Sequence, residues 1–297
     1  MKEHQIGPIR FLPGPKKGKY PHCHSVYIEG AGVLIDPASD REQLERLRKE
    51  EGVRMVWLTH WHEDHMTHLD LFSDLPLWIG RQDAPPLADL ETFLDWYGMD
   101  QPENVHLRDI WTLIMTKQFR FAPRTPDRLL NDGELIELDD IPVRVIHSPG
   151  HTPGHLAFWF PEQEAIFLGD YDLTPFGPWY GDRYSSISQT RNSAAVLREI
   201  PAATWFTCHE TGIFQGDTQA LWDQYLAVID RRTEKLMDFI TTPHTMEEII
   251  NQWIVYGKPR EPKDFFIFGE RAIMGKHLEM LMESGDVVCE GNCYKAL

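Results

Sequence analysis

Residues 59–65 read Thr-His-Trp-His-Glu-Asp-His, and this stretch decides how the rest of the chain is interpreted. It places four potential metal ligands within six residues, namely His60, His62, Asp64 and His65. The residues before it, Arg-Met-Val-Trp-Leu-Thr at 54–59, form an apolar run typical of a buried strand. Reactive groups in α/β sheets gather beyond the carboxyl ends of strands, so we expect the cluster at a sheet edge. Imidazole and carboxylate ligands held on one turn suit a pair of divalent metal ions.

Three later apolar runs, each typical of a short strand, are also followed by His or Asp. These residues are His151 after the run 142–146, Asp170 after 165–168, and His209 after 204–207. Glycines on both sides of His151 allow close approach of the backbone, and Pro153 stiffens the loop. A buried carboxylate at Asp170 is costly unless it binds a metal or a cation. Four strand ends therefore deliver ligand-type side chains.

The order of the other elements indicates an α/β protein. Residues 25–36 predict a hairpin around Gly30-Ala31-Gly32, residues 40–51 a short surface helix, and residues 188–200 a further helix. Residues 80–128 have poor periodicity and dense aromatics, which favours an insertion or lid. Its aromatic residues are Phe93, Trp96, Tyr97, Trp111, Phe119 and Phe121.

Beyond the segment 1–218, the pattern of residues 219–297 changes to helices. Apolar spacing predicts helices over 221–240, 246–254 and 271–282, followed by a hairpin over 287–294. Thr245 and Glu248 form a capping box at the start of the second helix. Three helices and a hairpin are the order of a winged-helix module, so we expect a second module here.

Composition limits the partners and the compartment. The 297 residues carry 29 Lys and Arg against 46 Asp and Glu, a net charge of −17 that disfavours nucleic acid and anionic lipid. Four cysteines, Cys23, Cys208, Cys289 and Cys293, are too few and scattered for a disulfide framework. The start Met1-Lys-Glu-His is not a signal sequence, and no apolar run reaches about 18 residues. We therefore expect a cytoplasmic protein that does not enter a membrane.

The motifs THWHEDH, GHTPGH, FLGD and TCHETG, in this order, resemble those of the metallo-β-lactamase superfamily of binuclear hydrolases. The resemblance covers about residues 20–215 and implies an αββα sandwich with metals at one sheet edge. It further implies the ligand set. The first metal is assigned to His60, His62 and His151, the second to Asp64, His65 and His209, and Asp170 is assigned as the bridge.

The resemblance also assigns Asp36, at the end of an early strand, as an acceptor that orients a metal-bound histidine. A turn-capping role before Pro37 competes with this assignment. The expected cofactors are two divalent ions, with zinc expected and iron or manganese also compatible with His and Asp ligands. Four other histidines receive no assigned role, namely His22, His24, His68 and His155.

The expected reaction is hydrolysis of a small carbonyl ester, thioester or lactone by a metal-bridged hydroxide. Asp64 and Asp170 would steer this hydroxide and accept its proton as the catalytic residues. The loop 171–184 follows Asp170 directly and is rich in aromatic residues, so Trp179 and Tyr180 are expected to wall an acyl pocket.

Three alternative functions remain open at this stage. A nuclease or phosphodiesterase would need a basic surface, but residues 221–297 hold nine Lys and Arg against thirteen Asp and Glu. An iron-dependent oxidoreductase could resemble a persulfide dioxygenase or a flavodiiron protein, although flavodiiron proteins use glutamate where His62 stands. A non-enzymatic regulator would not need seven ligand-type residues. The C-terminal module is therefore expected to form a homodimer or to cover the active site.

Overall fold

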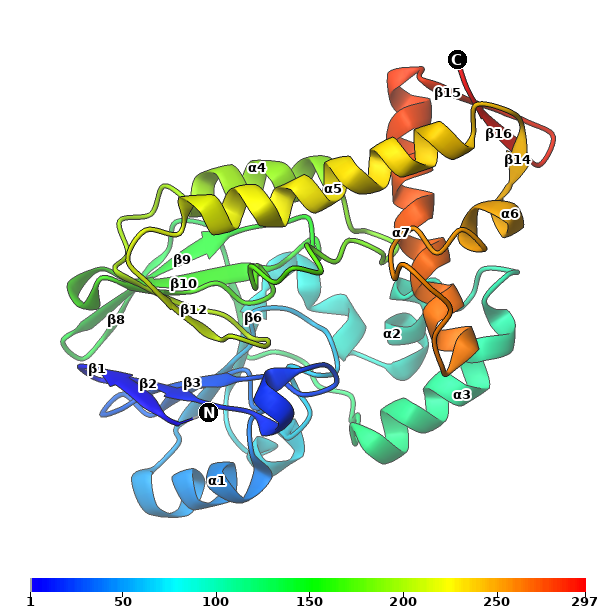
Figure 1. The fold of residues 1–297 in the computed structure, drawn as a ribbon. Coiled ribbons are helices and arrows are strands. Elements are labelled where there is room, and N and C mark those ends of the chain that lie inside the picture. Colours follow the sequence, from blue (N-terminus) through cyan, green and yellow to red (C-terminus); the bar gives the residue numbers. More distant parts are fainter. Residues whose placement is uncertain (1) are drawn as a thin grey trace.

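Two β-sheets pack face to face, with helices against both outer surfaces (Figure 1). The computed structural model describes residues 2–297. The first sheet has seven strands in chain order, antiparallel from β1 to β4 and parallel from β4 to β7. These strands are β1 (His4–Ile6), β2 (Ile9–Leu12), β3 (Ser25–Ile28), β4 (Val33–Ile35), β5 (Met55–Trp57), β6 (Leu77–Gly80) and β7 (Arg128–Leu130).

The second sheet has six strands in the order β13-β12-β11-β10-β9-β8, and only its β11–β12 pair is parallel. Its strands are β8 (Leu135–Leu138), β9 (Ile141–His147), β10 (Leu156–Phe160), β11 (Ala165–Phe167), β12 (Thr204–Phe206) and β13 (Ile213–Gln215). Alternate side chains of both sheets form one core between them. Within it, the rings of Trp57 and Phe158 lie 5.2 Å apart and those of Phe11 and Phe206 lie 5.5 Å apart.

Helices cover the outer face of each sheet, which confirms the αββα sandwich. The first sheet is covered by α1 (Arg41–Arg46), α2 (Leu90–Trp96) and α3 (Arg108–Leu113), and the second by α4 (Ile187–Leu197) and α5 (Gln219–Phe239). Two π-helical turns, Leu47–Glu51 and Ile114–Gln118, extend α1 and α3. Short 3₁₀ turns lie at Pro15–Gly18, Leu69–Phe72, Arg81–Asp83, Pro85–Leu87, Val105–Leu107 and Pro161–Gln163.

The aromatic-rich segment 80–128 packs against the first sheet. Phe93 and Trp111 are buried in the core that also holds Trp61 and Met66, the residues beside the metal-ligand motif. The Trp61 ring lies 4.8 Å from that of Phe93. These rings therefore pack beneath the loop that carries residues 59–65. Phe93 and Trp111 belong to the core, so the expectation of a lid is wrong for these two residues.

The C-terminal helices form a separate core with a small sheet. This part contains β14 (His244–Thr245), α6 (Met246–Ile250), α7 (Lys263–Ser284), β15 (Val287–Glu290) and β16 (Cys293–Ala296), with β16 between β14 and β15. The capping box of Thr245 and Glu248 is present. The predicted winged-helix character and the boundary at residue 218 stay predictions.

Two predicted helix ranges are wrong. The second helix ends at Ile250, because Trp253 has a φ of +53° that no helix accommodates, although its side chain and that of Ile254 are still buried. The third helix begins at Lys263, eight residues earlier than the predicted 271, directly after Pro262. Among residues 2–297, no helix has the length and apolar character needed to cross a membrane.

The alternation on β8 provides a test of the sandwich. Leu138 faces the core between the sheets with 8% of its surface exposed, whereas Leu135 on the same strand is 51% exposed. We expect Leu138→Ala to lower the free energy of unfolding by about 2–3 kcal/mol and Leu135→Ala to change it by less than about 0.5 kcal/mol. Urea denaturation of both variants measures the difference. Equal losses would contradict the orientation of this strand.

Candidate metal centre

The ligand-bearing loop leaves β5 and is fixed at its base by Asp36. Asp36 Oδ1 accepts a hydrogen bond from Thr59 N at 2.8 Å, and Oδ2 accepts one from Thr59 Oγ1 at 2.8 Å. Asp36 is fully buried and has a φ of +52°, a left-handed conformation that Asp tolerates better than most residues. The end of β4 thus orients the loop that follows β5.

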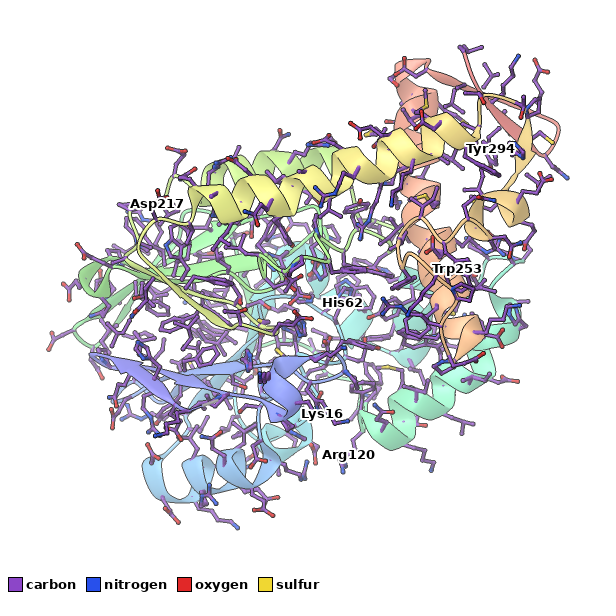
Figure 2. All side chains as sticks on the ribbon, viewed as in Figure 1. Lys16, His62, Arg120, Asp217, Trp253 and Tyr294 are labelled. Carbon is purple, nitrogen blue, oxygen red and sulfur yellow. The ribbon has the colours of Figure 1, made fainter. Side chains whose placement is uncertain are left out.

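Three imidazoles converge on one point at the edge of the sandwich. His151 Nε2 lies 3.1 Å from His60 Nε2 and 3.0 Å from His62 Nδ1. Asp170 Oδ2 is 3.4 Å from the same atom of His151. His62 lies where the sandwich meets the C-terminal helices (Figure 2). These four side chains could hold one metal ion.

The outward nitrogen of each of these rings has a hydrogen-bond partner. His60 Nδ1 lies 2.9 Å from Thr59 Oγ1, and His151 Nδ1 lies 3.1 Å from the carbonyl oxygen of Trp179. His62 Nε2 lies 2.7 Å from Asp182 Oδ2. If the outward nitrogens carry the protons, the converging nitrogens present lone pairs, which is the form that binds a metal.

A second group of ligand-type atoms lies beside the first. His209 Nε2 is 3.4 Å from Asp64 Oδ2, and His65 Nε2 is 3.8 Å from Asp64 Oδ1. The outward nitrogens are again occupied, with His65 Nδ1 at 2.9 Å from Asp36 Oδ2 and His209 Nδ1 at 2.7 Å from the carbonyl oxygen of Gly18. Asp64, His65 and His209 could therefore hold a second ion.

Asp170 reaches both groups. Its Oδ1 lies 3.0 Å from His65 Nε2 and 3.3 Å from His209 Nε2, while its Oδ2 faces His151. His65 Nε2 and Asp170 Oδ1 are buried, yet neither has a hydrogen-bond partner of good geometry within residues 2–297. Buried polar atoms are seldom left without a partner, and a cation between these two would supply it. The residues present therefore fit a divalent metal ion.

The charged groups of the site shift one another's pKa values. Burial raises the pKa of the Asp170 carboxyl, but the nearby charges of His209, His65 and His151 outweigh it and hold the pKa well below its usual value. Burial lowers the pKa of His62, but the charge and hydrogen bond of Asp182 outweigh this effect and raise the pKa to about 9. Asp170 thus remains a charged carboxylate, and at neutral pH a metal ion has to displace a proton from His62.

The structure reveals contacts that the sequence motifs did not indicate. Asp182 lies in the aromatic-rich loop 171–184, and its carboxylate contacts the imidazole of His62 directly. Glu63, inside the ligand motif, turns away and accepts hydrogen bonds from the hydroxyl groups of Tyr20 and Tyr97. Asp83 accepts hydrogen bonds from Thr152 Oγ1 and the Gly154 amide, and so holds the loop that carries His151. No local sequence signal identifies these pairs, because each joins distant segments.

The two expected pocket residues have different places. The indole nitrogen of Trp179 donates to Asp182 Oδ1 at 3.1 Å, so Trp179 lies beside the ligands. The expectation for Tyr180 is corrected. Its side chain is fully buried, and its hydroxyl lies 2.9 Å from His277 Nε2 in the C-terminal core. It therefore faces away from any open pocket.

Three of the four unassigned histidines have a partner for the ring, and the fourth, His22, makes its contact through the backbone. His155 Nε2 accepts a hydrogen bond from the Asp170 amide at 3.1 Å, which helps to fix the residue that carries this carboxylate. His24 Nδ1 accepts one from the Gly14 amide at 2.8 Å. The carbonyl oxygen of His22 lies 3.1 Å from His209 Nδ1, and His68 Nδ1 lies 3.5 Å from a guanidinium nitrogen of Arg41.

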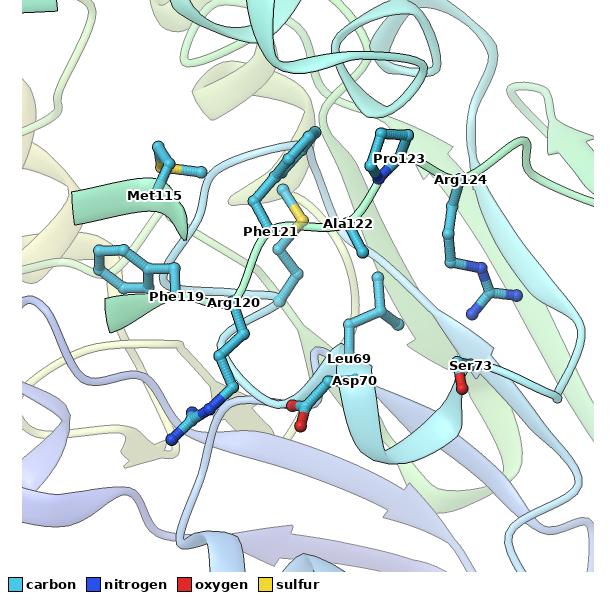
Figure 3. A pocket seen from close by; sticks show the side chains of 11 residues that line it. Leu69, Asp70, Ser73, Met115, Phe119, Arg120, Phe121, Ala122, Pro123 and Arg124 are labelled. Atoms are coloured by element: carbon cyan, nitrogen blue, oxygen red, sulfur yellow. The ribbon is translucent and has the colours of Figure 1, made fainter. Parts of the chain in front are cut away.

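A cavity of about 200 Å³ lies between the segments 66–73 and 115–124 (Figure 3). None of the seven ligand-type residues lines it. Its walls are Met66, Leu69, Asp70, Ser73, Met115, Phe119, Arg120, Phe121, Ala122, Pro123 and Arg124. Two rings of the aromatic-rich segment, Phe119 and Phe121, therefore line open space that is separate from the converging ligands.

Comparison with known proteins agrees with this geometry. A family model described as the metallo-beta-lactamase superfamily matches residues 20–209. The chain is 40% identical over 93 residues to a hydroxyacylglutathione hydrolase of Rhodospirillum rubrum, covering 30% of this chain and 35% of that protein. It is 30% identical over 178 residues to an acyl-coenzyme A thioesterase of Gallus gallus, covering 59% of this chain and 58% of that protein. The chain thus spans less than two thirds of the length of both relatives.

A solved structure shares the fold over almost the whole chain. A metallo-beta-lactamase family protein of Thermus thermophilus superposes with a TM-score of 0.71 at 24% identity, covering 98% of this chain and 99% of that chain. The likeness therefore includes the C-terminal helices as well as the sandwich. The chain belongs to the metallo-beta-lactamase superfamily.

Proposed function

We propose that this protein binds two divalent metal ions and hydrolyses an acyl thioester, with small esters and lactones as related substrates. The observation that carries the proposal is the carboxylate of Asp170, whose two oxygens face two separate groups of ligand-type atoms. Zinc is the expected metal, because imidazole and carboxylate ligands in a closed, rigid setting suit it, although iron and manganese accept the same ligands.

Bound divalent ions lower the pKa of water and polarise a carbonyl oxygen, which is the chemistry that hydrolysis requires. The residues of this chain supply position and charge. His60, His62 and His151 would hold one ion, and Asp64, His65 and His209 the other. Asp64 and Asp170 would accept a proton and orient the attacking water, since their carboxylates face the point where both groups meet. The contact between Asp36 and His65 supports the orienting role proposed for that carboxylate.

Two observations favour a carbonyl substrate over a phosphodiester. Relatives are named as a hydroxyacylglutathione hydrolase and an acyl-coenzyme A thioesterase. The loop after Asp170 offers one guanidinium, Arg183, and this group is paired with Asp100 at 2.6 Å. It is therefore not available to a phosphate group. Trp179 lies beside Asp182, and we propose it as an apolar wall for the acyl part of the substrate.

Replacing Asp170 tests the shared carboxylate. We expect Asp170→Ala to reduce the metal content from two equivalents to one or fewer and to lower kcat by more than about 100-fold, because both groups lose a ligand. Elemental analysis of protein dialysed without added metal measures the first effect, and steady-state kinetics measures the second. The control is Asp230→Ala, an exposed aspartate on α5, which should retain both. Wild-type activity in Asp170→Ala would contradict the bridging role.

A substrate panel tests the reaction class. The protein is assayed with acyl thioesters, esters, lactones, a bis-aryl phosphodiester and single-stranded RNA. We expect the highest kcat/KM with an acyl thioester, complete loss of activity with a chelator, and recovery when zinc is added back. Cleavage of phosphodiesters alone would show that the carbonyl assignment is wrong and would favour a nuclease.

A further inference from the structure

The loop 176–185 lies between the metal centre and the C-terminal helices, and it is hydrogen-bonded to both. We infer that Arg232 of α5, through this loop, positions the ligands His62 and His151. The C-terminal helices would thus form a supporting part of the metal centre without contributing a ligand. The inference rests on the proposed metal centre and assigns a positioning role to Arg232 and Asp182.

On one side, the loop holds two metal-ligand residues through three hydrogen bonds. His62 Nε2 lies 2.7 Å from Asp182 Oδ2, and His151 Nδ1 lies 3.1 Å from the carbonyl oxygen of Trp179. Ser185 Oγ donates to the carbonyl oxygen of His151 at 2.6 Å. Both histidines belong to the group that could hold the first ion. Any shift of this loop would therefore act on that group.

The loop also fixes its own carboxylate. Trp179 Nε1 donates to Asp182 Oδ1 at 3.1 Å, and the Asp182 amide donates to Ser185 Oγ at 3.1 Å. Asp182 is 2% exposed. Because Oδ1 contacts Trp179 and Oδ2 contacts His62, the Asp182 carboxylate is fixed in one orientation toward the imidazole.

On the other side, Arg232 holds the loop at three alternate residues. One terminal guanidinium nitrogen donates to the carbonyl oxygen of Pro178 at 3.1 Å and to the hydroxyl of Tyr180 at 3.0 Å. The other donates to the carbonyl oxygen of Phe176 at 2.9 Å. Tyr180 in turn lies 2.9 Å from His277 Nε2 of α7. The segment has no helix or strand of its own, so these side-chain bonds determine its path.

The burial and the hydrogen bonds of Arg232 support this positioning role. The side chain is 2% exposed, and among residues 2–297 it forms no ion pair. Burying a guanidinium is costly unless it is hydrogen-bonded, and here its two terminal nitrogens donate three hydrogen bonds to the loop and none to a carboxylate. An apolar residue would fill the same space but would leave the carbonyl oxygens of Phe176 and Pro178 without this donor.

The experiment compares Arg232→Met with Arg231→Met, the same change at the adjacent, exposed residue of α5. Asp182→Ala removes the acceptor of His62 directly. The affinities of the two metal equivalents are measured separately, by competition of the zinc-loaded protein with a chromophoric chelator. The metal-free proteins are compared by nitrogen-15 NMR of the histidine side chains, which detects the imidazole N–H groups of His62 and His151.

We expect Asp182→Ala to lower the affinity for one metal equivalent by about 10–100-fold and to leave the affinity for the other within about 2-fold of the wild type. We expect Arg232→Met to weaken the same equivalent by about 10-fold, and Arg231→Met to change neither. The imidazole N–H signals of His62 and His151 should be protected from exchange in the wild type and in Arg231→Met, and lost or broadened in Arg232→Met. If Arg232→Met leaves both affinities unchanged, or weakens both equally, the inference is wrong.

Tyr180→Phe provides a second variant in case Arg232→Met does not fold. It removes only the hydroxyl that joins Arg232 to His277, and we expect a smaller loss, about 2–5-fold, at the same equivalent. No change in that variant would count against the inference. A wild-type protein that binds no metal would refute the proposed function instead. The NMR comparison of metal-free proteins would then still test the link from Arg232 to the two histidines.

Discussion

The convergence of five imidazole nitrogens and two carboxylates on one small volume is the constraint on which the rest of the structure depends. Their nearest atoms lie 3.0–3.1 Å apart in a buried space, so protons or metal ions must balance the charges of the carboxylates. The fold accommodates this arrangement because each ligand comes from a loop at the end of a strand. The strands are paired in two rigid sheets, so the loops are held by ladders of backbone hydrogen bonds.

Much of the fold and the ligand set could be predicted from the sequence, because the deciding signals are local. The motif at residues 59–65 follows an apolar run, and Asp170 and His209 follow others, so their places at strand ends could be read from the sequence, whereas their grouping into two metal sites came from the resemblance to the superfamily. In each case the residue and the strand that positions it are neighbours in the chain.

The remaining features could not be predicted, because they depend on contacts between distant segments. Tyr180 is aromatic and close to Asp170 in sequence, but a buried guanidinium 52 residues away draws its hydroxyl into the C-terminal core. Asp182 carries no motif, and only the folded chain brings it to His62. The spacing of Trp253 and Ile254 also predicted a longer α6. These side chains are buried, but they belong to the turn after the helix, which ends at Ile250.

Helix α5 is shared by two cores. Its first half, with Trp222 and Tyr225, packs against the second sheet, and its second half, with Ile229 and Leu236, packs against α7. The same helix carries Arg232, which reaches the loop beside the ligands. The loop and α5 therefore depend on each other, and protein engineering should treat them as one structural unit. A C-terminal region taken from a relative would not necessarily carry an arginine that bonds this loop. Chimaeras should therefore exchange residues 171–186 together with α5 and α7.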